Sequence, residues 1–234
     1  MILDAYKLST AIFQIQFPTA YVLWDTAGTI ASRLASIWPD LELVEGRPDQ
    51  QILKGRGVQL QSTLKQCNVT LRGENSLDQQ RTSQLTKTFE VWRQVLQLCT
   101  LTRVSTRLIY SRAFPSLDEA NIALLELGLV HWPLGKVFDQ PQKSEKNSFD
   151  LQFKFEDDVS FSFLRFHSEK LEFKADLDPD FVKEHEIRSI RCRLHIDFDR
   201  GHLGEVAADK FRMEDWIKGV QHILRRDIEK VVRA

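Results

Sequence analysis

The stretch Arg103-Val-Ser-Thr-Arg-Leu-Ile-Tyr-Ser-Arg112 lies just before the midpoint of this chain of 234 residues. Its side chains alternate with a period of two, with Val104, Thr106, Leu108 and Tyr110 on one face and Arg103, Ser105, Arg107, Ile109 and Ser111 on the other. Because β-branched and aromatic residues are frequent in it, the stretch predicts a strand. The segments before and after this strand predict elements in a similar order. We therefore expect a central strand between two related halves.

The first half predicts a strand, a helix, an antiparallel meander and a second helix. A strand is expected at 11–17 and a helix at 21–38, since a proline closes each pattern. Short strands are expected at 41–44, 51–53, 58–64 and 67–71. The second helix is expected to begin at a capping box of Ser76 and Gln79 and to bury the stripe Leu85, Phe89, Trp92, Leu96 and Cys99.

The second half predicts a similar order after the central strand. Ser116 and Glu119 form another capping box, and the helix that they begin is expected to end at Gly128. A polar loop is expected at 135–148. Strands are expected at 149–155, 159–163, 171–177 and 190–198, with turns at 156–158 and 167–170, and a last helix from Met213.

These patterns predict an α+β fold of duplicated β-α-β-β-β(-β)-α units, in which helices cover one face of antiparallel sheets. The expected units are residues 1–100 and 101–234. The alternative is a single domain with one continuous sheet that runs through the central strand.

Composition excludes several classes of protein. Hydrophobic residues at 42% and charged residues at 28% predict an ordered globular protein rather than a disordered one. The net charge of −1 provides no long-range field, so a nucleic-acid site would have to be a local patch. No apolar run approaches the ~18 residues of a membrane span, and the first residues lack the pattern of a signal peptide. The three cysteines lie far apart in apolar segments, which predicts reduced, buried thiols and a cytoplasmic location.

The central strand also resembles the mid-chain signature R-hydrophobic-G-L-R-Y-I-N of a sporadically distributed family of uncharacterised bacterial proteins. The Phe17-Pro18 strand end, the strand that bears Asp197 and the helix from Met213 are similar to other landmarks of that family. Ser105 occupies the position where the family tends to have glycine, and the asparagine of the signature has no clear counterpart at Tyr110 or Ser111. The resemblance implies no specific activity. The family's patchy distribution implies a place in a defence or toxin–antitoxin locus.

Charged residues on two expected strands are the candidate binding residues. Arg103 and Arg107 project from one strand face, where they could bind carboxylate or phosphate groups. Cross-strand ion pairs with acidic residues are the commoner role of such arginines. On the last strand, the face opposite the apolar one carries Arg191, Arg193, His195, Asp197 and Asp199. Such alternating charges are usually a solvated surface.

The sequence contains no recognised catalytic or metal-ligand motif. His195, Asp197, Asp199 and His202 are close in sequence, but they do not have the spacing of known histidine–carboxylate metal motifs. No catalytic residue, metal or cofactor is therefore expected.

The sequence favours a non-catalytic binding or assembly protein whose open sheet face carries Arg103, Arg107, Arg191, Arg193, His195 and Asp197. The expected partner is another protein, a second copy of the chain or a small acidic ligand, and no membrane. Nucleic-acid binding by the same face is the first alternative. An enzyme with an unrecognised site is the second.

Overall fold

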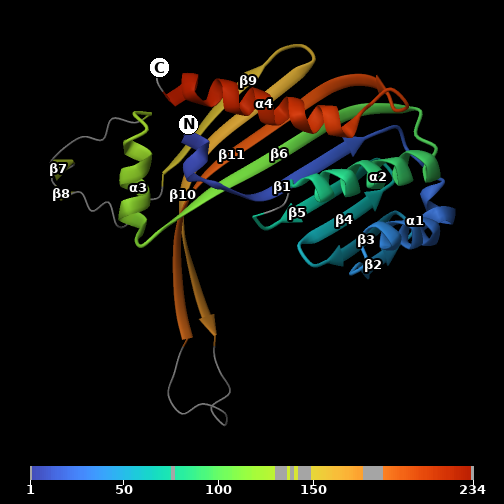
Figure 1. Ribbon diagram of the computed structural model, residues 1–234, viewed down its shortest axis with the longest axis horizontal. Coiled ribbons are helices and arrows are strands. Elements are labelled where there is room, and N and C mark those ends of the chain that lie inside the picture. Colours follow the sequence, from blue (N-terminus) through green and yellow to red (C-terminus); the bar gives the residue numbers. More distant parts are fainter. Residues whose placement is uncertain are drawn as a thin grey trace, which may run out of the picture.

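A nine-stranded antiparallel sheet is the main feature of the part of the chain that the computed structural model describes (Figure 1). The described residues are 2–74, 77–129, 136–137, 140–141, 149–175 and 187–232. The strands in spatial order are β2 (Glu42–Arg47), β3 (Gln50–Gly55), β4 (Val58–Thr63), β5 (Gln66–Arg72), β1 (Lys7–Gln16), β6 (Thr100–Phe114), β11 (Ile187–Ala207), β10 (Ser160–Ala175) and β9 (Asp150–Glu156).

Four helices, a short 3-10 helix and a small hairpin complete the described elements. They are the 3-10 helix η1 (Ile2–Ala5), the helices α1 (Leu23–Ile37), α2 (Gln79–Val95), α3 (Leu117–Leu125) and α4 (Met213–Val232), and the hairpin of β7 (Lys136–Val137) with β8 (Gln140–Pro141). None of these helices has the length and apolar character that crossing a membrane requires.

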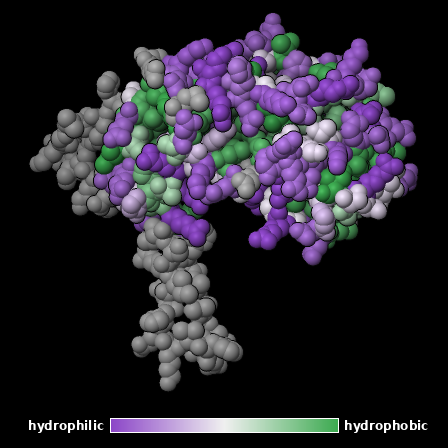
Figure 2. Space-filling model, in the orientation of Figure 1, coloured by the Kyte–Doolittle hydropathy of each residue, from purple (hydrophilic) through white to green (hydrophobic). Residues whose placement is uncertain are grey.

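The prediction of an α+β fold with helices on one face is confirmed. The Trp92 indole of α2 donates a 2.9 Å hydrogen bond to Ser62 of β4, and the Trp216 indole of α4 donates one of 2.8 Å to Thr106 of β6. Figure 1 shows α2 and α4 lying across the sheet, and in the same orientation hydrophilic residues make up most of the visible surface of the described residues (Figure 2). The other two helices contact the same face through hydrogen bonds. Gln51 of β3 donates one to the Ala27 carbonyl of α1, and Ser168 of β10 donates one to the Asn121 side chain of α3.

The two halves of the chain have corresponding strand orders on either side of the β1–β6 pair. From this pair outwards the first half runs β1, β5, β4, β3, β2 and the second half runs β6, β11, β10, β9. The sheet is therefore continuous through the central strand, and β6 is one of its middle strands. The correspondence lies in connectivity, and a duplication of the sequence itself stays a prediction.

One expected turn is instead the middle of a strand. Residues 167–170 were expected to separate two strands, but β10 runs through them without interruption and pairs with β11 along its whole length. Their polar side chains suggest a turn when the segment is taken alone, whereas pairing of all four residues with β11 holds the segment extended. Phe161 and Phe163, the aromatic residues of the expected strand 159–163, project from the face opposite the helices, because they pair with Gly201 and Asp199.

Two local details at α2 differ from the predictions. The cap of α2 is Asp78, which accepts a 2.7 Å hydrogen bond from the backbone of Arg81, while Ser76 lies outside the described residues. Cys99 was expected on the buried stripe but is exposed, because α2 ends at Val95. The cap of α3 at Ser116 is confirmed, with a 3.1 Å bond from the Glu119 amide.

Candidate functional site

The sheet face opposite the helices carries mostly polar side chains, and we call it the open face. Strand pairing assigns residues to this face, because Arg107 lies opposite both Ile12 and Asp199 in the ladders. In the first half the open face carries the amides and hydroxyl of Gln14, Gln16, Gln59, Gln61, Gln66, Asn68 and Thr70. In the second half it is charged and carries Arg107, Arg165, His167, Glu169, Arg193, His195, Asp197 and Asp199.

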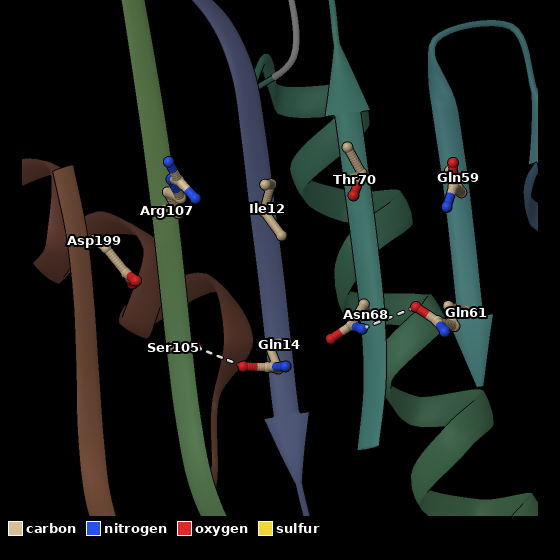
Figure 3. Close-up of a pocket in the computed structure, with 9 residues that line it drawn as sticks. All are labelled: Ile12, Gln14, Gln59, Gln61, Asn68, Thr70, Ser105, Arg107 and Asp199. Carbon is tan, nitrogen blue, oxygen red and sulfur yellow. Dashed lines mark hydrogen bonds between the residues drawn. The ribbon is translucent and has the colours of Figure 1, made fainter. Parts of the chain in front are cut away.

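A small hollow of about 230 Å³ lies in the amide-rich part of this face (Figure 3). Its lining comes from β1, β4, β5, β6 and β11, and Arg107 and Asp199 are its charged members. Asn68 donates a 3.2 Å hydrogen bond to Gln61, and Ser105 donates one of 3.3 Å to Gln14. Because pockets for drug-sized ligands are usually larger, about 300–1,000 Å³, this hollow suits a single polar group better than a large cofactor.

Arg107 forms an ion pair with Asp197 of the neighbouring strand. Its Nε lies 2.8 Å from Oδ1 and 3.1 Å from Oδ2 of Asp197, and its Nη2 also bonds to Oδ2. This bonding raises the pKa of the Arg107 guanidinium. The side chain of Asp197 is only 2% exposed, whereas that of Arg107 is 42% exposed. Arg107 therefore neutralises a buried carboxylate and still presents part of its guanidinium to solvent.

Arg103 does not act together with Arg107. Its guanidinium stacks 4.8 Å from the centroid of the Phe161 ring, and its Nε is buried with no hydrogen-bond partner among the described residues. Phe161 in turn lies over Gly201, where an added Cβ would be 2.2 Å from the ring. The two arginines share a face, as predicted, but they contact different groups.

Asp199 lies opposite Arg107 in the β6–β11 ladder. Partial burial raises its pKa, and the charges of Arg103 and Arg107 oppose this effect without cancelling it. The Asp199 carboxylate is therefore a group whose negative charge is disfavoured by its surroundings.

A second, wider hollow on the open face lies between the end of β1–β5 and the strands β10 and β11, and we call it the basic hollow. Five cationic side chains of the open face line it, against three acidic ones: Lys7, Arg72, Arg107, Arg165 and Arg193 against Glu74, Glu169 and Asp197. Arg112 also borders the hollow, but it pairs with Leu194, so its side chain projects from the helix-covered face, where it stacks on Phe114. Lys7 pairs with Glu74 and Arg165 pairs with Asp150 on β9. Within the described part of the chain, Arg72 and Arg193 make no ion pair, so the hollow has an excess of positive charge.

Three potential metal ligands come together beside the basic hollow. His167 and Glu169 on β10 and His195 on β11 place one ligand atom each within 4.8 Å of the others. The Nε2 atom of His195 is 2.8 Å from Oε1 of Glu169, and the two imidazole rings stack with centroids 4.7 Å apart. Burial, followed by the charges of His195 and Arg165, lowers the pKa of His167, which favours its neutral form.

The structure thus distributes the sequence-predicted residues over different places. Arg107, Arg193, His195 and Asp197 line the basic hollow, whereas Arg103 and Arg191 do not. His202, which the sequence places near His195, pairs with Val104 of the helix-covered face and points away from the open face.

The sequence did not indicate Arg72, His167 and Glu169 as site residues. The signal for the last two is their i, i+2 spacing, which puts both side chains on one face if the segment is a strand. The polar composition of 167–170 favours a turn, and in a turn this spacing has no such meaning.

No protein-family model matches this chain, and no curated protein matches it significantly in sequence. The proposals below therefore rest on the chemistry of the open face.

Proposed function

We propose that this protein is a non-catalytic binding protein that receives an acidic segment of a protein partner on its open face. The observation that carries the proposal is the basic hollow, where five cationic side chains face three acidic ones. Arg72 and Arg193 have no ion-pair partner in the part of the chain that the structure describes. Their guanidinium groups are therefore available to a ligand from outside the chain.

Guanidinium groups bind carboxylate and phosphate in a bidentate manner, and such charge-assisted hydrogen bonds are about twice as strong as neutral ones. The hollow is wide and open, and it adjoins the amide side chains Gln14, Gln61 and Asn68. Amides both donate and accept hydrogen bonds, so they suit the backbone of an extended peptide. This combination favours an acidic peptide over a compact small molecule.

Nucleic acid fits the same surface less well. Asp197, Asp199 and Glu169 interrupt the positive charge along β10 and β11, and the chain as a whole has a net charge of −1. A polyanion that tracks across a sheet needs a continuous cationic path, because most of its affinity comes from phosphate neutralisation.

Fluorescence anisotropy with three labelled probes tests the proposal. The probes are a ten-residue Asp/Glu peptide, the same peptide with Asn and Gln in place of its acids, and a 20-nucleotide single-stranded DNA. The variants Arg72→Gln and Arg193→Gln each remove a cation of the hollow, and Arg225→Gln removes an exposed cation of α4 as a matched control.

We expect the acidic peptide to bind more tightly than the neutral one. Each hollow variant should weaken this binding by roughly 10-fold or more, in line with the loss of a hydrogen bond to a charged group. Arg225→Gln should bind like the wild type. Equal affinity for the acidic and neutral peptides would refute the proposal. Tighter binding of the DNA with a steep salt dependence would favour the nucleic-acid alternative.

A further inference from the structure

The cluster of His167, Glu169 and His195 has the composition and placement of a metal site. His167 and Glu169 are two residues apart on β10, so their side chains project from the same face. His195 lies directly opposite His167 in the β10–β11 ladder. The three ligand atoms lie within 4.8 Å of one another, although 26 residues separate Glu169 from His195 in sequence.

Two unsatisfied nitrogens provide a second, independent observation. Nδ1 of His167 and Nδ1 of His195 are both buried, and neither has a hydrogen-bond partner in the described part of the chain. His195 as a whole is only 6% exposed. A buried polar atom without a partner destabilises the folded state, so such atoms are normally paired with protein, water or a bound group. The contact between His195 and Glu169 does not satisfy either Nδ1 atom.

We propose that His167, Glu169 and His195 bind a divalent transition-metal ion, with zinc as the best fit. Two imidazoles and one carboxylate are a known ligand set for zinc sites that keep a coordination position open. Calcium and magnesium prefer sites made of oxygen ligands alone. The open coordination position would face the basic hollow, which the three residues line together with Arg193 and Arg165.

The present geometry is close to that of a loaded site. In a tetrahedral zinc site with bonds of about 2.0–2.1 Å, neighbouring ligand atoms lie roughly 3.3 Å apart. The nitrogens and the carboxylate oxygen, now within 4.8 Å, can reach that separation by side-chain shifts of about 1–1.5 Å. The backbone positions are already set by the strand ladder. The arginines around the hollow oppose a bare cation, while Glu169 and the neighbouring Asp197 attract it, so we expect moderate rather than extreme affinity.

The metal site is independent of the proposed binding of an acidic partner, and its test uses the metal alone. Untagged protein treated with a chelator is titrated with Zn²⁺ in competition with a chromophoric chelator, and Co²⁺ is then added to report the ligand type from its visible spectrum. The variants are His167→Gln and Glu169→Gln, with His222→Gln on α4 as the control. Cys99→Ser is included because Cys99 is an exposed thiol.

We expect one Zn²⁺ per chain for the wild type, His222→Gln and Cys99→Ser. The affinity should fall at least ~10-fold in His167→Gln and Glu169→Gln, because loss of even an outer-shell partner of a metal ligand commonly has this effect. Zn²⁺ should also raise the melting temperature of the wild type and not that of the two ligand variants, whose metal-free circular dichroism should match the wild type. Equal Zn²⁺ affinity in all proteins, no measurable binding, or a thiolate band in the Co²⁺ spectrum would overturn the proposal.

Discussion

Replacing Arg107 with alanine should destabilise the protein, because it leaves the carboxylate of Asp197 buried without its counter-charge. Removing one partner of a buried ion pair costs about 3–5 kcal/mol. The side chain of Arg107 is 42% exposed, so water already screens the pair and can enter the space left by the mutation. We therefore expect a loss of about 2–3 kcal/mol. For a domain of this size each kcal/mol lowers the melting temperature by about 2–4 °C, so the expected fall is about 4–12 °C.

Urea unfolding followed by tryptophan fluorescence measures this loss in a double-mutant cycle of Arg107→Ala and Asp197→Asn. The double variant should be more stable than Arg107→Ala alone, because it carries no unpaired buried charge. Arg103→Ala is the comparison on the same strand, and it should lose only the stacking on Phe161, about 0.5–1 kcal/mol. An Arg107→Ala variant within 0.5 kcal/mol of the wild type, or a coupling near zero, would refute the view that Asp197 depends on Arg107.

Three further outcomes are expected from the packing and the pKa shifts. Phe89→Ala should lower the free energy of unfolding by about 3–5 kcal/mol because the ring is fully buried. Gln84→Ala should lower it by only about 1 kcal/mol, since the Gln84 amide donates a 2.9 Å hydrogen bond to a carbonyl of α1. Equal urea midpoints for the two variants would contradict this expectation. Asp199→Asn should raise the melting temperature at pH 7. The pKa of the Asp199 carboxyl is higher in the folded protein than its value of 3.8 in the unfolded chain, so the wild type loses stability as the pH rises from 3.8 through the folded pKa. The gain should vanish below pH 3.8, and a gain that persists there would show that charge is not its cause. Gly201→Ala should lower the melting temperature because the new Cβ would meet the Phe161 ring at 2.2 Å, and a second change of Phe161 to alanine should recover part of the loss.

Features that depend on neighbours along the chain were predictable from the sequence. The alternation in Arg103–Arg112 predicted both β6 and its two faces, since side chains of a strand alternate whatever the strand pairs with. Ser116 was predictable as the cap of α3 because its hydrogen bond spans only three residues. The hydrogen bond of the Gln84 side chain, in contrast, does not follow from the local sequence because its acceptor lies 47 positions away.

Which strand lies beside which was decided by the tertiary structure. The alternation of side chains along a strand shows which of them share a face. It does not show whether the residue opposite them on the next strand is Asp197, His195 or a residue of another unit. The polar run 167–170 shows the limit most clearly, because its own composition favours a turn and the ladder to β11 keeps it extended. That single difference places His167 and Glu169 beside His195. The sequence by itself determined most of the elements and the two faces of β6, because those follow from local periodicity. The pairing of distant strands decided the ion pair, the basic hollow and the candidate metal site, because each joins residues that are neighbours only across the sheet.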